Sequence, residues 1–238
     1  MYRTKSFWIS VFISSAVGLL VILHVSMLQV PPPLSPFIQG DGFYIYRGEV
    51  SKRQSISIQI PAEGPSGLPV TEIAANAFKN FKNLKTVEIP DTIIEIHDNA
   101  FRGCIALESV YIPDSVTKIG HSAFRDCVKL EMVTGLNSVA EISAYMFMDC
   151  PALKEITLPE SVRAIHTQAF FGASLKEITI LYSGVVSIAG DPFAKCPIDR
   201  VWVRNLTVQG QYHSLPTSSN WRPYLSPTIK IWDVAYKP

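Results

Sequence analysis

Hydrophobic residues recur at a fixed interval of 23 residues through the middle of the chain. Three columns keep this spacing in six copies: a phenylalanine, an isoleucine five residues before it and, eight residues before it, a valine in five copies and Ile93 in the other. The phenylalanines are Phe78, Phe101, Phe124, Phe147, Phe170 and Phe193. One unit cannot bury its own apolar face, so this internal repeat predicts a solenoid of stacked units that share one core.

Each unit follows the pattern V-x-x-I-x-x-x-A-F-x-x-C-x-x-L-x-x-V-x-I-P. The L-x-x-V-x-I segment, for example Leu107 to Ile112, alternates apolar and other residues and is rich in β-branched types, which predicts a short strand. The proline that follows, such as Pro113, has no N–H for a ladder and is expected to end the strand. The A-F-x-x-C-x-x-L segment has apolar positions three apart, which favours a helical or 3₁₀ turn. The pattern therefore predicts an α/β solenoid.

The stretch IPDSVTKIGHSAFRDCVKLEMV, which begins at Ile112, resembles the BspA-like, or treponemal-type, leucine-rich repeats. The resemblance is strong over residues 61–203 and looser at both ends. It implies a leucine-rich-repeat superhelix of six stacked 23-residue repeats. It also implies a role in adhesion, because relatives of this repeat type are surface proteins associated with binding to host matrix proteins and to other cells.

The flanking segments resemble the ends of such domains, and the C-terminal motif comprises Tyr212, Trp221, Tyr224 and Ile229. An uncovered solenoid end would expose apolar core and an open strand edge, so both flanks are expected to be caps. The expected organisation is a signal anchor at 1–30, a Pro-rich linker at 31–41, N-terminal cap strands at 42–69, leucine-rich repeats at 70–203 and a C-terminal cap at 204–238.

Residues 7–28 form an apolar run that follows Arg3 and Lys5. At about 1.5 Å per residue, a helix of this length crosses a hydrocarbon core of roughly 30 Å. No A-x-A-like site follows the run, which favours an uncleaved transmembrane signal anchor, with a cleaved signal peptide as the alternative. In both cases the positive-inside rule predicts that the body after Pro31 is exported, to the periplasm or the cell surface. Cleavage would make the protein secreted.

The charge and the motifs exclude several functions. The net charge is +1 and no basic cluster is present, so nucleic-acid binding is not expected. The sequence contains no H-E-x-x-H, G-x-S-x-G, Walker or G-x-G-x-x-G motif. We therefore expect no cofactor, no metal and no small-molecule substrate, and the chain is not predicted to be an enzyme.

The cysteines share one column of the repeat, whose other members are Phe81 and Ala173. Such a column indicates buried free thiols, with a disulfide between stacked neighbours as the alternative in an exported protein. His97 and His166 lie three coils apart in another column, about 14 Å from each other on strand spacing. That distance indicates rim histidines rather than a shared zinc site. The cysteines are Cys104, Cys127, Cys150 and Cys196.

The solvent side of the predicted strands is the candidate binding surface, because the two positions that flank the valine point outward together. Tyrosine, tryptophan, methionine and arginine are enriched at protein interfaces. The alternative is a Thr-rich ladder that stabilises the sheet by cross-strand packing, with Trp202 covered by the C-terminal cap. The candidate partner-binding residues are Glu88, Tyr111, Met132, Glu155, Glu177, Arg200 and Trp202.

Two functional hypotheses follow. The first is an exported, membrane-tethered leucine-rich-repeat module that binds a protein partner, either a host matrix protein or an envelope protein. In this hypothesis residues 7–28 contact the membrane. The second is a periplasmic or envelope scaffold that has no external ligand. The repeats themselves indicate a stable extended surface, and a fold does not determine a function.

Overall fold

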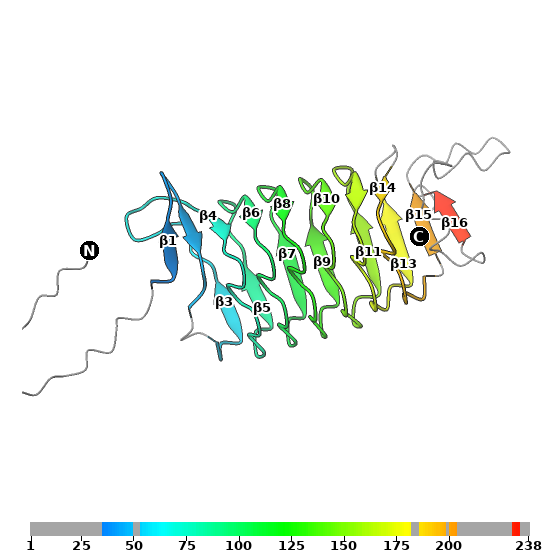
Figure 1. The fold of residues 1–238 in the computed structure, drawn as a ribbon, viewed down its shortest axis with the longest axis horizontal. Coiled ribbons are helices and arrows are strands. Elements are labelled where there is room, and N and C mark those ends of the chain that lie inside the picture. The colour runs from blue at the N-terminus through cyan, green and yellow to red at the C-terminus, as the bar shows by residue number, and fades with distance from the viewer. Residues whose placement is uncertain (1–34, 50–52, 182–185, 199, 204–229, 234–238) are drawn as a thin grey trace, which may run out of the picture. The chain divides into compact units, whose positions relative to one another are not determined.

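The computed structural model describes residues 35–49, 53–181, 186–198, 200–203 and 230–233. The chain divides into two compact units, residues 1–34 and residues 35–238, and the first lies outside the described residues together with the apolar run at 7–28. Within the described residues, no helix is long and apolar enough to cross a membrane. The second unit is a β-solenoid whose coils stack along one axis (Figure 1).

Each coil contributes one strand to a long-strand ladder, as the sequence predicts. Its strands pair in parallel, with breaks in the hydrogen-bonded pairing between β5 and β7 and between β9 and β11. Across the first break, the Glu108 N–H still donates to the Lys85 carbonyl at 3.1 Å. The long-strand ladder comprises β3 (Ser57–Gln59), β5 (Thr86–Glu88), β7 (Ser109–Ile112), β9 (Met132–Gly135), β11 (Glu155–Leu158), β13 (Glu177–Ile180), β15 (Arg200–Val203) and β16 (Lys230–Asp233).

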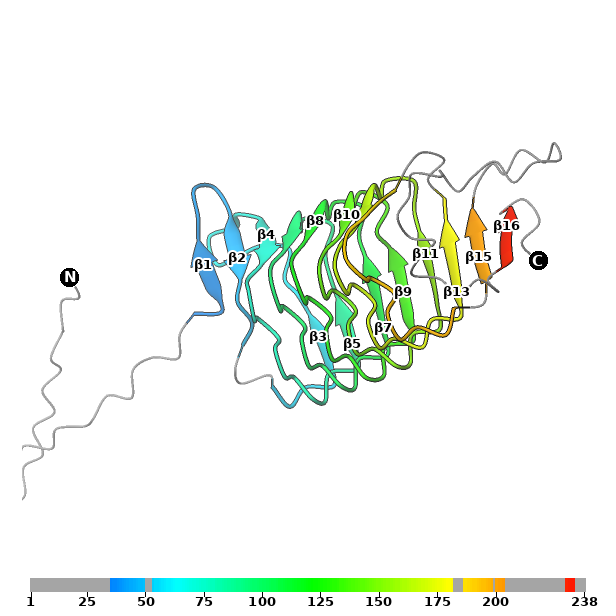
Figure 2. The same cartoon turned by 45° about the vertical axis from the view of Figure 1, so that its right-hand side comes forward.

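A second ladder, which the sequence reading missed, runs along the other side of the coils (Figure 2). We call it the short-strand ladder, because most of its strands have two residues. β1 pairs antiparallel with β2, the other pairings are parallel, and the hydrogen-bonded pairing is broken between β8 and β10. It comprises β1 (Phe37–Gln39), β2 (Tyr44–Tyr46), β4 (Val70–Ile73), β6 (Glu95–Ile96), β8 (Lys118–Ile119), β10 (Glu141–Ile142), β12 (Ala164–Ile165) and β14 (Ser187–Ile188).

The repeated phenylalanines form a continuous stack inside the solenoid. Neighbouring rings from Phe78 to Phe193 lie 4.9–5.7 Å apart, with interplanar angles between 1° and 14°. The valine, isoleucine and leucine columns surround this stack and are buried over most of its length. The predicted shared core is therefore confirmed.

The helical turn predicted for the A-F-x-x-C-x-x-L segment is wrong: the described residues contain no helix there. Alternate N–H groups donate to the next coil, and the intervening ones donate three residues back, which gives overlapping β-turns. Asn99 and Gly103 have positive φ, 56° and 73°, as the third position of some β-turn types requires. The last two turns, Phe101–Cys104 and Cys104–Leu107, each span three residues, so they reproduce the apolar spacing of a helix. The bonds to the next coil are Asn99 N–H to His121 (2.9 Å), Phe101 N–H to Ala123 (2.8 Å) and Gly103 N–H to Arg125 (2.8 Å).

The coil that contains β9 departs from the others where its strand ends. Gly135 and Leu136 replace the Ile-Pro pair of the neighbouring coil, and both have positive φ, 86° and 67°. A Cβ on Gly135 would lie 1.8 Å from the Ile112 carbonyl oxygen. Leu136 is fully buried, so the strand ends at this turn without a proline and still supplies an apolar side chain to the core.

The two ends of the solenoid contain strands outside the repeats. Strands β2 and β3 occur within residues 42–69 as expected, and Phe37 packs edge-on against Tyr44 and Tyr46 at 5.7 and 5.5 Å. Near the C-terminus, β16 pairs in parallel with β15. The capping role of both flanks stays a prediction, and the C-terminal motif residues Tyr212 to Ile229 lie outside the described residues.

Candidate interaction surface

The long-strand ladder presents two columns of outward side chains on either side of a buried valine or isoleucine. In β7 and β9, Ser109 pairs in register with Met132, and Tyr111 pairs with Thr134. Tyr111 is 55% exposed and Met132 is 59% exposed, although both belong to regular strands. Large side chains of these two types are frequent at protein interfaces, so this part of the ladder is the candidate interaction surface.

Exposed apolar side chains concentrate on the two coils that carry these strands. The turns that lead into β7 and β9 add Ile105 and Val128, which are 41% and 45% exposed. Among the described residues, these two coils hold four of the seven large hydrophobic side chains that are exposed. We call Ile105, Tyr111, Val128 and Met132 the apolar patch.

Glutamates lie next to the apolar patch on the long-strand ladder. Glu88, Glu131 and Glu155 are exposed, and none of them forms an ion pair within the part of the chain that the structure describes. By contrast, the Glu108 carboxylate lies 3.3 Å from the Lys85 ammonium. The charge of Glu108 is therefore compensated, and those of the other three are not.

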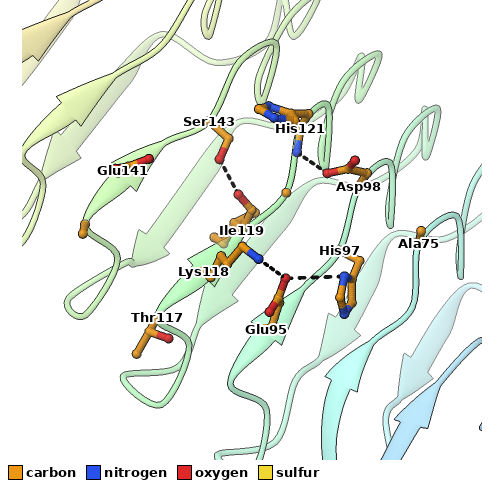
Figure 3. A pocket seen from close by; sticks show the side chains of 12 residues that line it. Ala75, Glu95, His97, Asp98, Thr117, Lys118, Ile119, His121, Glu141 and Ser143 are labelled. Atoms are coloured by element: carbon orange, nitrogen blue, oxygen red, sulfur yellow. Dashed lines mark hydrogen bonds and ion pairs between the residues drawn. The ribbon is translucent and has the colours of Figure 1, made fainter.

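The short-strand ladder carries a polar groove around Gly120, with a volume of about 630 Å³ (Figure 3). Its walls include Glu95, His97, Lys118 and Glu141. A Cβ on Gly120 would lie 2.4 Å from the Asp98 carboxylate and 2.5 Å from the Asp98 backbone nitrogen, so glycine permits the close approach of the two coils. A larger residue at position 120 would therefore push these two coils apart in the wall of the groove.

Ion pairs connect successive coils along the edge of this groove. The His97 ring lies 2.7 Å from Glu72 through Nε2 and 3.4 Å from Glu95 through Nδ1. The Lys118 ammonium lies 2.7 Å from Glu95, and the hydrogen bond and charge of that carboxylate raise the pKa of Lys118. His166 repeats the pattern at 3.0 Å from Glu141. These side chains already pair with one another, so this edge of the groove joins successive coils.

The histidines lie at the rim, as the sequence predicts: His97 and His166 are half-buried and His121 is exposed. Within the described residues, no group of three or more histidine, cysteine or acidic side chains could hold a metal ion. The sequence signal that could have revealed the ion pairs is the column Glu72, Glu95, Lys118 and Glu141, which precedes the repeated isoleucine.

The four cysteines are free, so the disulfide alternative is wrong; Cys104, Cys127 and Cys150 are buried as predicted, whereas Cys196 is half-buried. Burial raises the pKa of Cys104, Cys150 and Cys196 to about 12 and that of Cys127 well above its ordinary value. Each thiol donates to the carbonyl of a phenylalanine in the preceding coil. The Sγ–O distances are 3.1 Å from Cys104 to Phe78, 3.3 Å from Cys127 to Phe101, 3.2 Å from Cys150 to Phe124 and 2.9 Å from Cys196 to Phe170.

Residues 71–199 match the family model described as the BspA type leucine rich repeat region, in six copies. The chain belongs to this family. The column of buried cysteine, phenylalanine or alanine and the stacked phenylalanines are thus features of its BspA-type repeats.

Solved structures of bacterial leucine-rich-repeat proteins share this fold. The leucine-rich-repeat protein of T. pallidum is 24% identical with a TM-score of 0.54, and the alignment covers 70% of this chain and 81% of that protein. A leucine-rich cell surface protein of Faecalibacterium prausnitzii is 30% identical with a TM-score of 0.52, and the alignment covers 70% of this chain. The alignment spans 52% of that protein's length. No curated relative matches the chain.

The structure places the predicted binding residues of this BspA-type solenoid on one ladder but in different environments. Glu88, Tyr111, Met132 and Glu155 are exposed, whereas Glu177 is half-buried. In the same outward column as Tyr111, Thr179 is buried, so the outward side of the long-strand ladder is less exposed to solvent at β13 than at β7. Arg200 and Trp202 occupy the expected strand positions, in register with Glu177 and Thr179, but their side chains are outside the described set.

Proposed function

We propose that this BspA-type leucine-rich-repeat chain is a binding module that contacts a protein partner through the long-strand ladder. The observation that carries the proposal is the exposure of Tyr111 and Met132 on paired strands of a regular sheet. Tyrosine and methionine side chains that are exposed on neighbouring strands are typical of an interaction site. In the groove on the short-strand ladder, His97, Lys118 and Glu141 already take part in ion pairs between coils, so it is the weaker candidate.

Site-specific photo-crosslinking tests which face meets the partner. A benzophenone amino acid at position 111 is expected to capture a discrete protein in cells that make this chain. The same amino acid at position 94 is the matched control, because Ile94 is 50% exposed next to the short-strand ladder. Equal capture at both positions, or capture at position 94 alone, would contradict binding through the long-strand ladder.

We also propose that the solenoid is exported and tethered to a membrane, where it mediates adhesion. Two observations support this: the apolar run at residues 7–28 after Arg3 and Lys5, and the likeness to a protein described as a cell surface protein. An amine-reactive biotin reagent that cannot cross membranes should label intact cells at exposed lysines such as Lys118. If labelling requires lysis of the cells, the surface placement is wrong and a scaffold inside the envelope is favoured.

A further inference from the structure

The apolar patch lies in a part of the long-strand ladder where the charged outward side chains are acidic. We infer that this surface binds a positively charged protein segment that presents at least one apolar side chain. The inference rests on the proposed function and adds the chemistry of the partner to it.

The apolar component is confined to two neighbouring coils. Met132 lies between Ser109 and Glu155 in its outward column, and Tyr111 lies between Glu88 and Thr134 in the other. The patch therefore ends after one coil in each direction along the stack. A partner can bury these side chains with one or a few apolar residues, as in the small central clusters that dominate the binding energy of interfaces.

The acidic component surrounds this centre. From Thr86 to Thr157, the charged side chains in the two outward columns are Glu88 and Glu155, and both are exposed. Glu131, in the position before β9 and outside the two columns, is also exposed, and Lys154 occupies the equivalent position before β11. These three carboxylates have no ion-pair partner among the residues that the structure describes, so a partner can supply the missing positive charge.

The lysines of this region do not reverse the negative charge of the two outward columns. Lys85 is compensated by Glu108 at 3.3 Å. Lys154 occupies the position before β11 that Glu131 occupies before β9, and Lys129 lies two residues before Glu131, so neither lysine is in the two outward columns that flank the buried valines. The two outward columns therefore present apolar groups and the carboxylates of Glu88 and Glu155, whereas Glu131 and the lysines lie where the turns meet the strands.

The two components have different effects on binding. Burial of Tyr111 and Met132 removes apolar surface from water and provides most of the affinity. An exposed ion pair changes the affinity only severalfold, but an acidic partner brings like charges together and is rejected. The carboxylates are therefore expected to determine the sign of the partner's charge more than the strength of binding.

Selection from a phage-displayed library of random 12-residue peptides tests this chemistry on the full-length chain in detergent. Two variants remove the two components separately: Tyr111→Ser with Met132→Ser, and Glu88→Gln with Glu131→Gln and Glu155→Gln. The matched control, Ile94→Ser with Glu141→Gln, changes exposed residues on the side of the short-strand ladder. All substitutions affect exposed side chains, and unchanged thermal unfolding verifies that the variants are folded.

Peptides that need the apolar patch are expected to be rich in lysine or arginine and to contain an aromatic or aliphatic residue. Binding of synthetic copies should fall at least about tenfold in the apolar variant and severalfold in the Gln variant, and should not change in the control. Selected peptides that are neutral or acidic, yet lost in the apolar variant, would overturn the inferred charge and leave the proposed function standing. The absence of any patch-dependent peptide, together with no crosslink at position 111, would overturn both.

Discussion

At the scale of single residues, the cysteines act as hydrogen-bond donors in a core that has few other side-chain donors. Each thiol reaches the carbonyl of a phenylalanine from the preceding coil, at a place where the turns leave that carbonyl free of the two ladders. Alanine at position 173 fills the same column without this bond. The residue type therefore adjusts the contact between coils and does not determine the fold.

The same thiols predict a loss of stability at alkaline pH. Burial raises the pKa of Cys150 to about 12, from an ordinary value of 9.0. The folded state thus holds the proton more tightly than the unfolded state. The resulting contribution of the Cys150 thiol to the free energy of unfolding is complete below pH 9 and is lost as the pH rises towards 12. At about pH 10.5 the loss should be of order 2 kcal/mol for one thiol.

Urea unfolding of the wild type and of Cys150→Ala at about pH 8 and pH 10.5 measures this contribution. The variant lacks the titrating group, so the wild type should lose more stability between the two pH values than the variant does. Equal losses in the two proteins would show that the Cys150 thiol does not titrate in this way.

At the scale of elements, the sequence predicts the long strands, the shared core and the outward position of Tyr111 and Met132, because the strand period is visible in six copies. The turns could not be predicted from apolar spacing, since the successive turns Phe101–Cys104 and Cys104–Leu107 place apolar residues three apart, as a helical turn does. Asn99 and Gly103 signal positive φ, but Tyr145 and Gln168 occupy the equivalent of the Asn99 position with φ of 59° and 52°. Strands of two residues are too short for a period, so the short-strand ladder and its ion pairs were missed.

The turn after β9 gives a prediction at this scale. Gly135→Ala should destabilise the solenoid by at least about 2 kcal/mol, because the new Cβ meets the Ile112 carbonyl in addition to the strain of positive φ. Gly67→Ala is the control: it has φ of 77° and nothing within 4 Å of the added Cβ. Denaturant midpoints compare the two. A Gly135→Ala midpoint no lower than that of Gly67→Ala would mean that the coils separate easily at this turn.

At the scale of the whole molecule, the described solenoid is a one-dimensional stack in which each coil contacts its neighbours. The phenylalanine stack shows these contacts between neighbouring coils: the ring centroid of Phe124 lies 5.3 Å from that of Phe101 and 5.7 Å from that of Phe147. Phe193 stacks on Phe170 at 5.5 Å. The stability of such a stack is approximately a sum of the stabilities of its units and of the interfaces between them. The effect of truncating a core side chain on unfolding should therefore depend on its position along the stack as much as on its size.

We predict different unfolding behaviour for Phe124→Ala and Phe193→Ala. Each removes a buried phenylalanine, at a cost of about 3–5 kcal/mol locally. In the middle of the stack the loss weakens two interfaces and separates the coils on either side, so the denaturant transition should broaden or split. Near the last repeat the loss should release the terminal coil, with increased amide exchange confined to residues from 186 onward and little change around Phe101.

Amide hydrogen exchange measured by mass spectrometry distinguishes the two patterns. If amide exchange rises evenly in all coils of both variants, the solenoid unfolds as one cooperative unit. The interfaces between coils would then be much more stable than the individual coils.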